Sequence, residues 1–164
     1  MERRTVESET EWESAVGYSR AVRVGSHVSV SGTTATDAER NVVDGDAYEQ
    51  ATRAISNVER ALEEAGASLA DVVRTRIYVA DVDDWEEVGR AHAEAFGDVR
   101  PATTMVEVSR LIDPELVVEI EADATVAASD NTDDADDTDD ADDTDDAGDG
   151  VGGDADESTG SGAE

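Results

Sequence analysis

A ten-residue stretch near residue 120 most constrains how this chain can fold. Within residues 117–126, an apolar side chain stands at every second position from 118, and acids stand between them at 119, 121 and 123, which is the period of a β-strand with one face against a core and the other exposed. The apolar face holds Val118, Ile120, Ala122, Ala124 and Val126, and the other holds Glu119, Glu121 and Asp123. The sequence therefore predicts a strand in a sheet that has one face buried against a core and the other face exposed to solvent.

Residues 47–65 carry the strongest helical signal in the chain. Their apolar side chains, many of them alanine, recur at the i, i+3, i+4, i+7 spacing of a helix that packs along one face. Asp46 and Glu49 form a capping-box pattern at the start, and Gly66 supplies the left-handed residue that ends such a helix. We expect this helix to approach the sheet closely, because alanine leaves little side chain between them.

The remaining elements follow from the same reasoning. Gly25 and Ser26 predict a hairpin between two short strands, with a further edge strand near Thr5 and Val6. Later in the chain we predict a strand over residues 72–80, a second helix over 84–96 and a strand over 102–108. The order β-β-β-α-β-α-β-β predicts an α+β fold, a two-layer sandwich with two helices on one face of a mixed sheet.

The sheet face opposite the helices is predicted to be mixed in character. By alternation it would carry Ser29, Ser31, Arg76, Tyr78, Thr103, Met105, Glu107, Glu119 and Glu121. This set is too polar for a core and rich in Tyr and Met for a surface in plain solvent. We interpret it as a subunit contact lined with small polar clefts.

Acidity is the main compositional feature of the 164 residues, whose formal net charge is −31. Residues 1–129 hold 27 acidic residues and all 12 basic ones, every one an arginine, so this part alone carries −15. Residues 130–164 are built mainly from Asp, Thr, Ala, Gly and Ser, with Val151 as the single large aliphatic residue. Such a segment cannot offset its ordering entropy. We predict a folded domain over 1–129, a disordered acidic tail over 130–164, and a halophilic origin.

Several classes of function are disfavoured. The chain has no cysteine, so no thiol nucleophile is available. His92 lies on the apolar face of the predicted second helix, as a core histidine does, and His27 has no acidic residue at metal-ligand spacing. No glycine-rich phosphate loop follows a strand, so no cofactor is implied. No apolar run approaches the roughly 20 residues that span a bilayer, and acids outnumber bases throughout. We expect a cytoplasmic protein that binds no membrane, nucleic acid or metal.

Two short segments resemble the Rid family, the YjgF-like enamine and imine deaminases. The family signature P-A-R stands here as Pro101-Ala102-Thr103, and its E-I-E stands as Glu119-Ile120-Glu121. The resemblance extends over about residues 17–125. It implies a chorismate-mutase-like fold and a homotrimer with a cleft for a small-molecule ligand between subunits.

The resemblance also implies site residues. Tyr18 matches the tyrosine that borders the family cleft, Ser31-Gly32 matches a pair whose backbone lines it, and Glu119 matches the glutamate that positions the attacking water. Thr103 replaces the arginine that binds the substrate carboxylate, and Thr104 offers a second hydroxyl. The simpler interpretation of Glu119 and Glu121 is the wet face of an antiparallel strand.

Three functional hypotheses remain from the sequence. The first is a Rid-like hydrolase for a small imine or enamine, with Glu119 as the base. Thr103 lacks the guanidinium that would donate two parallel hydrogen bonds to a substrate carboxylate. This hydrolase would therefore not be a typical 2-imino acid deaminase. The second is a non-catalytic trimer that binds a metabolite or partner protein through the same cleft. The third, RNA cleavage, is disfavoured by the negative charge.

We predict that the stability of the fold rises steeply with salt. The −15 charge of residues 1–129 opposes compaction, and salt shortens the Debye length from about 10 Å at 0.1 M to about 3 Å at 1 M. Circular dichroism during denaturation, across a series from dilute buffer to molar potassium chloride, measures this. A flat profile would contradict the halophilic interpretation.

Overall fold

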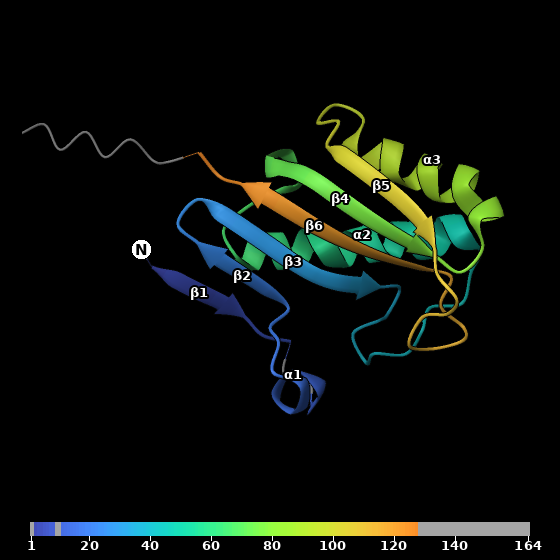
Figure 1. Cartoon of the computed structure of the whole chain (residues 1–164), viewed down its shortest axis with the longest axis horizontal. Coiled ribbons are helices and arrows are strands. Elements are labelled where there is room, and N and C mark those ends of the chain that lie inside the picture. The colour runs from blue at the N-terminus through green and yellow to red at the C-terminus, as the bar shows by residue number, and fades with distance from the viewer. Residues whose placement is uncertain (1, 9–10, 128–164) are drawn as a thin grey trace, which may run out of the picture. The chain divides into compact units, whose positions relative to one another are not determined.

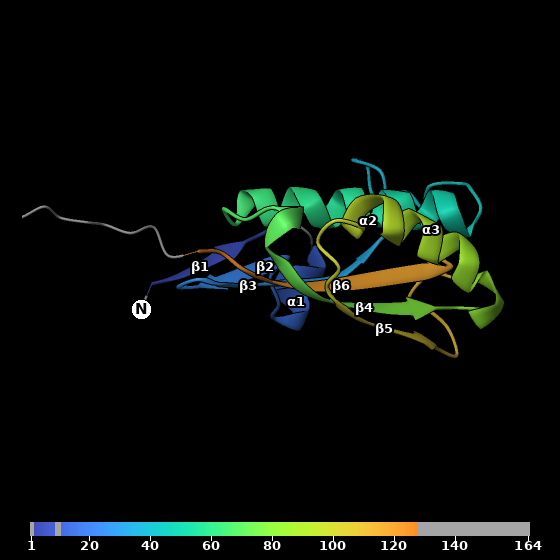
Figure 2. The ribbon, with the colours of Figure 1, turned by 90° about the horizontal axis from the view of Figure 1, so that it is seen from above.

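The computed structural model describes residues 2–8 and 11–127, and these form one mixed sheet with two long helices on one face (Figures 1 and 2). The strands are β1 (Arg3–Val6), β2 (Ala21–Val24), β3 (His27–Thr34), β4 (Val72–Val79), β5 (Ala102–Glu107) and β6 (Val118–Thr125). The helices are α1 (Glu11–Val16), α2 (Ala47–Glu64) and α3 (Trp85–Phe96). The predicted α+β two-layer architecture is confirmed. The tail predicted over 130–164 lies outside the described residues.

The sheet has the strand order β1-β2-β3-β6-β4-β5 (Figure 1). β6, the strand with the strictest alternation in the sequence, lies near the middle and pairs antiparallel with both β3 and β4. β4 and β5 are parallel, and the crossover between them passes through α3. β6 therefore places its apolar side chains in the core and its acidic side chains on the opposite face, near the middle of the sheet.

The core lies between the sheet and helices α2 and α3. The apolar residues of β6 from Val118 to Ala124 are buried there, together with Ile77 and Val79 of β4 and the alanines of α2. The close approach predicted from these alanines is confirmed, since Ala51 and Ala54 are fully buried. Helices α2 and α3 both lie on this face, and neither covers the opposite face of the sheet, which we call the open face (Figure 2).

The predicted ends of α2 are also confirmed. The Glu49 amide donates to Asp46 Oδ1 over 2.9 Å, and the Asp46 amide donates to Glu49 Oε2 over 3.0 Å, which completes the capping box. At the other end Gly66 has a φ of 76°, the left-handed conformation that glycine adopts at lowest cost. The Arg23 guanidinium donates to the carbonyls of Ala65 and Gly66 there.

Helix α1 was not predicted from the sequence, which gave residues 1–17 only an edge strand. Trp12, Ala15 and Val16 do have helical spacing, but α1 has only six residues, too few to distinguish a helix from chance, and Trp12 and Val16 remain exposed. Tertiary contacts specify the segment instead: buried Glu13 accepts hydrogen bonds from the Ser8 amide and hydroxyl, and Gly17 follows the helix with a φ of 80°. The predicted edge strand is confirmed as β1.

Candidate functional site

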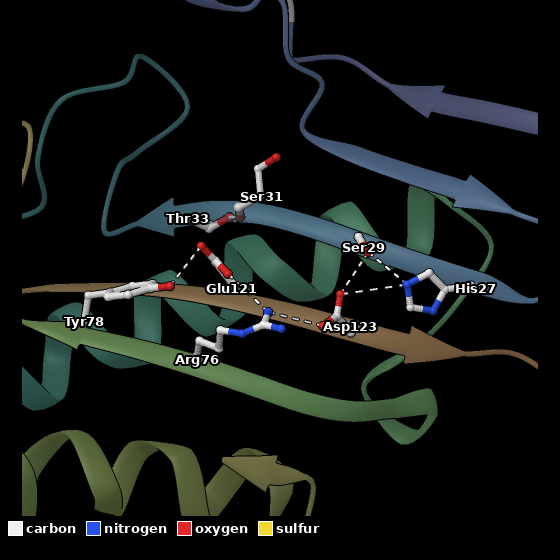
Figure 3. A network of polar contacts seen from close by, with 8 residues as sticks. All are labelled: His27, Ser29, Ser31, Thr33, Arg76, Tyr78, Glu121 and Asp123. Carbon is white, nitrogen blue, oxygen red and sulfur yellow. Dashed lines mark hydrogen bonds and ion pairs between the residues drawn. The ribbon is translucent and has the colours of Figure 1, made fainter. Parts of the chain in front are cut away.

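The open face of the sheet carries a continuous polar network across β3, β6 and β4 (Figure 3). Arg76 Nη1 lies 3.3 Å from Glu121 Oε2 and 3.2 Å from Asp123 Oδ2, and the Tyr78 hydroxyl donates to Glu121 Oε1 over 3.2 Å. Ser29 donates to the other oxygen of Asp123 over 2.8 Å. Two of the three outward acids of β6 are therefore paired within the sheet.

His27, the first residue of β3, joins this network. Its Nε2 lies 3.1 Å from Ser29 Oγ and 4.0 Å from Asp123 Oδ1. The sequence suggested no acidic neighbour for His27, because Asp123 is distant along the chain and reaches it only through the β3 and β6 register. The Ser29 hydroxyl donates to Asp123 directly, so these three residues do not form the relay of a nucleophilic serine.

A β-bulge interrupts β3 beside this network. Val30 pairs with Ala122 but Thr33 pairs with Ile120, so Ser31 and Gly32 together stand opposite one residue of β6. An extra residue of this kind bends a strand and changes the direction of nearby side chains. The Ser31 hydroxyl donates to the Ser19 carbonyl over 2.7 Å, which holds the bulge against the residues before β2.

Glu119 packs directly onto Gly32. A β-carbon at position 32 would overlap Glu119 Oε1, so glycine is required there for the carboxylate to occupy its place. Among the described residues, no hydrogen-bond donor reaches the Glu119 carboxylate. Burial raises the pKa of Glu119 above its ordinary value of 4.5, the charge of Glu121 adds to the rise, and Arg20 opposes it. Glu119 is thus a half-buried base with oxygens available to a water molecule or ligand.

Tyr18 and Arg20 form the wall of the site on the β2 side. Arg20 Nη1 donates to the Gly32 carbonyl over 2.8 Å and to Thr33 Oγ1 over 3.1 Å. Its Nη2 lies 3.5 Å from the Tyr18 hydroxyl, and its guanidinium carbon lies 5.8 Å from the centre of the Tyr18 ring. The structure thus brings four residues of the predicted site together, namely Tyr18, Ser31, Gly32 and Glu119.

Thr103 does not lie with them. In the parallel register Thr103 pairs with Thr75, Met105 with Ile77 and Glu107 with Val79, so these three β5 residues face the helices. Thr103 Oγ1 lies 2.9 Å from Thr75 Oγ1, which lies 2.9 Å from His92 Nε2. The prediction that Thr103, Met105 and Glu107 share the open face with Glu119 is wrong. Adjacent Thr103 and Thr104 left the alternation ambiguous, and only the pairing with β4 decides it.

Thr104 is the predicted β5 residue that does lie on the open face, paired with Arg76. The β5 neighbour of Tyr78, which itself pairs with Glu119, is Val106. Position 103 therefore cannot reach the Glu119 carboxylate within one chain, since the sheet separates them. A site that uses both positions requires a second copy of the chain.

His92 has the packing role that the sequence suggested. Besides its bond to Thr75, its ring lies 4.6 Å from the ring of Phe96, and burial lowers its pKa. Within residues 2–8 and 11–127, no group of three or more His, Asp or Glu side chains is placed to hold a metal ion. No helix in the same residues is long and apolar enough to cross a bilayer.

Sequence reasoning did not include Arg20 in the site. A usable signal was present, because Arg20 is two positions from Tyr18 and so shares its face of the chain. The carboxylate pairing of Arg76 with Asp123 required the β4 and β6 register, which periodicity alone does not give.

The fold and this open face define a class of protein: a small two-layer α+β domain with a polar site on the sheet face that its helices leave uncovered. A family model described as Endoribonuclease L-PSP matches residues 8–126. The chain belongs to this family, the YjgF-like or Rid family. The predicted family resemblance is therefore confirmed.

Three relatives illustrate the family. An uncharacterised protein of Streptomyces coelicolor is 40% identical over 128 residues, which cover 78% of this chain and 96% of that protein. The 2-iminobutanoate/2-iminopropanoate deaminase of Salmonella typhimurium is 34% identical over 112 residues, covering 66% and 87%. The crystal structure of Rv2704 from Mycobacterium tuberculosis, a YjgF/YER057c/UK114 family member, aligns with a TM-score of 0.70 and 56% identity, covering 76% and 100%.

We predict that Glu119→Gln stabilises the fold at neutral pH. Because burial raises the pKa of Glu119 in the folded state, the folded chain binds the proton more tightly than the unfolded one, and stability is lost as pH rises from about 4.5 through the folded pKa. The variant lacks this loss. The difference in unfolding free energy should therefore grow in favour of the variant between pH 4 and pH 7.

Denaturant unfolding at fixed molar salt measures that difference. The control is Glu64→Gln, which removes one negative charge from an exposed position on α2 and should produce no comparable growth. A difference for Glu119→Gln that stays constant with pH would show that the carboxylate is solvated as well in the fold as in the unfolded chain.

Proposed function

We propose that this protein is a deaminase-like hydrolase that acts on a small imine or enamine at a cleft between subunits of a homotrimer. The observation that carries the proposal is Glu119, a half-buried carboxylate with a raised pKa and no donor among the described residues. The family includes the 2-iminobutanoate/2-iminopropanoate deaminase, at 34% identity. Tyr18, Ser31 and Gly32 border the same site.

The proposed reaction is hydrolysis of a C=N bond. Water bound at Glu119 attacks the imine carbon while the carboxylate takes one of its protons and passes it to the imine nitrogen, which gives a carbinolamine. The C–N bond then breaks as the carbinolamine hydroxyl loses its proton to the same carboxylate, which passes it to the leaving nitrogen. The products are a carbonyl compound and ammonia, so atoms balance with water as the only co-reactant. A carboxylate with a raised pKa suits this role, because it accepts a proton readily and returns it near neutral pH.

The subunit cleft is supported by the separation of Thr103 from Glu119. β5 is the outer strand of the sheet, with Ala102, Thr103 and Thr104 exposed in the single chain. In the proposed trimer this edge lies against the open face of a neighbouring copy, which brings Thr103 and Thr104 of one copy near Glu119 of the next. The exposed Val106 on the open side of β5 would be covered in the same contact.

A non-catalytic trimer that binds a metabolite or a partner protein is the second candidate. The observation that favours it is the involvement of Thr103 in a hydrogen bond to Thr75, where deaminases of the family bind the substrate carboxylate through arginine. RNA cleavage, suggested by the family description, fits poorly with a net charge of −15 over residues 1–129, because phosphate binding depends on clustered cations.

Sedimentation at molar salt tests the assembly. We expect a trimer at micromolar concentration, because the mixed open face and the exposed edge of β5 are both unpartnered in one chain. A monomer would remove the basis for a site shared between subunits.

Turnover tests the chemistry. The native protein should hydrolyse 2-iminopropanoate poorly, because Thr103 forms no fork for its carboxylate. Thr103→Arg should raise turnover by roughly tenfold to several hundredfold, since hydrogen bonds to a charged group contribute about 1.5–3 kcal/mol each. Adding Glu119→Gln should abolish the gain by removing the base. The measurement is imine loss, with the imine supplied by an amino-acid oxidase.

The matched control for that series is Thr52→Arg. It adds the same side chain at an exposed position of α2, away from the proposed site, so it should give little or no gain. Equal gains from both variants would indicate a general effect of added positive charge. No gain from Thr103→Arg would mean that the cleft serves another ligand.

A further inference from the structure

Arg20 places a guanidinium in the candidate site from the β2 side of the sheet. The family resemblance did not include this residue in the site. It is half-buried and directly precedes β2. Its Nη1 is fixed by the Gly32 carbonyl at 2.8 Å and Thr33 Oγ1 at 3.1 Å. An arginine held at one end in this way loses little further side-chain freedom when it binds a ligand.

The opposite edge of this guanidinium is nearly unoccupied. Within the described part of the chain, the Nε and Nη2 edge makes only the long 3.5 Å contact to the Tyr18 hydroxyl. This edge presents two parallel N–H groups, the geometry that matches the two oxygens of a carboxylate. The Tyr18 hydroxyl beside it can donate a further hydrogen bond to the same anion.

Arg20 and Glu119 are both in contact with Gly32 but do not pair with each other. Arg20 bonds to the Gly32 carbonyl, and Glu119 packs where a β-carbon of residue 32 would be. Among the described residues, the ion pairs of the open face join Arg76 and His27 to Glu121 and Asp123, and none includes Arg20 or Glu119. Arg20 and Glu119 are therefore neighbours of the same residue, Gly32, and the Glu119 oxygens and the Nε and Nη2 edge of Arg20 have no short hydrogen bond among the described residues.

We propose that Arg20 is an acid-binding residue of this site, which binds a carboxylate of the ligand from the β2 side. The proposal rests on the proposed function for the location of the site and adds this residue to it. The Nε and Nη2 edge holds the carboxylate, and the Tyr18 hydroxyl supports it. Acid recognition then comes from the same chain as the base.

This arrangement differs from recognition through position 103. An arginine at position 103 would reach the site only from a neighbouring copy, whereas Arg20 contacts the same bulge as Glu119 in one chain. An acid held at Arg20 therefore need not take the orientation of an acid held at position 103. Tight binding of a small acid by the native protein is consequently compatible with slow turnover of 2-iminopropanoate.

The test measures ligand binding to the full chain at one fixed molar salt concentration. The probes are 2-oxobutanoate, which is the product of 2-iminobutanoate hydrolysis, and butanone, which has the ketone without the carboxylate. The native protein should bind 2-oxobutanoate and not butanone. Arg20→Gln should weaken 2-oxobutanoate binding by at least about tenfold, as expected for losing hydrogen bonds to a charged group. Arg74→Gln, which removes an exposed arginine of β4, should leave binding unchanged.

Arg20→Lys separates ligand binding from a purely structural role. It keeps the positive charge and one donor for the Gly32 carbonyl but cannot present two parallel N–H groups, so binding should fall while the thermal unfolding midpoint stays near native. Unchanged binding in both Arg20 variants, or no binding of 2-oxobutanoate by the native protein, would overturn the proposal. Glu119→Gln should bind 2-oxobutanoate at least as tightly as the native protein. Persistent turnover in that variant would contradict the proposed base without touching the role of Arg20.

Discussion

The alternation of β6 is the constraint on which the site depends. Burying its apolar side chains under α2 forces three acids onto the opposite face at every second residue, about 7 Å apart along the strand. Three like charges this close repel one another, and the neighbouring strands compensate two of them: Arg76 and Tyr78 pair with Glu121, and Arg76 and Ser29 pair with Asp123. Glu119 is the acid without such a partner, so the packing of the core isolates the candidate base.

The bulge in β3 explains how that isolated acid is accommodated. An unbroken β3 would continue the alternation and place a side chain beside Glu119. The extra residue at Ser31 and Gly32 instead leaves a position without a β-carbon, and the carboxylate fills it. The same backbone displacement exposes the Gly32 carbonyl to Arg20. One local irregularity thus determines the burial of the base, its raised pKa and the position of the nearest cation.

The sequence predicted those features that depend on the period of a single segment. The buried faces of β6 and α2, and the capping box of α2, could be predicted because each segment is long enough to show its own hydrophobic period. Helix α1 was not predicted because it has only six residues. It is held by the hydrogen bonds that Ser8 donates to Glu13 within the helix, and not by a buried apolar face. The sequence did not predict which β5 residues face the helices, because the adjacent Thr103 and Thr104 are chemically alike. Only the pairing of β5 with β4 decides this.

That pairing also determines how the two sides of the site relate. Thr103 packs toward Thr75 and His92 beneath the helices, whereas Glu119 lies on the open face. Recognition through position 103 would therefore need a second copy of the chain, and it would depend on how precisely the two copies dock. Arg20 and Glu119 are fixed to the same bulge in the same chain, so their separation is set by local backbone geometry. The negative charge of this chain opposes association at low salt. A site in which one chain supplies both the arginine and the base therefore depends less on assembly than a site that takes its arginine from a neighbouring copy.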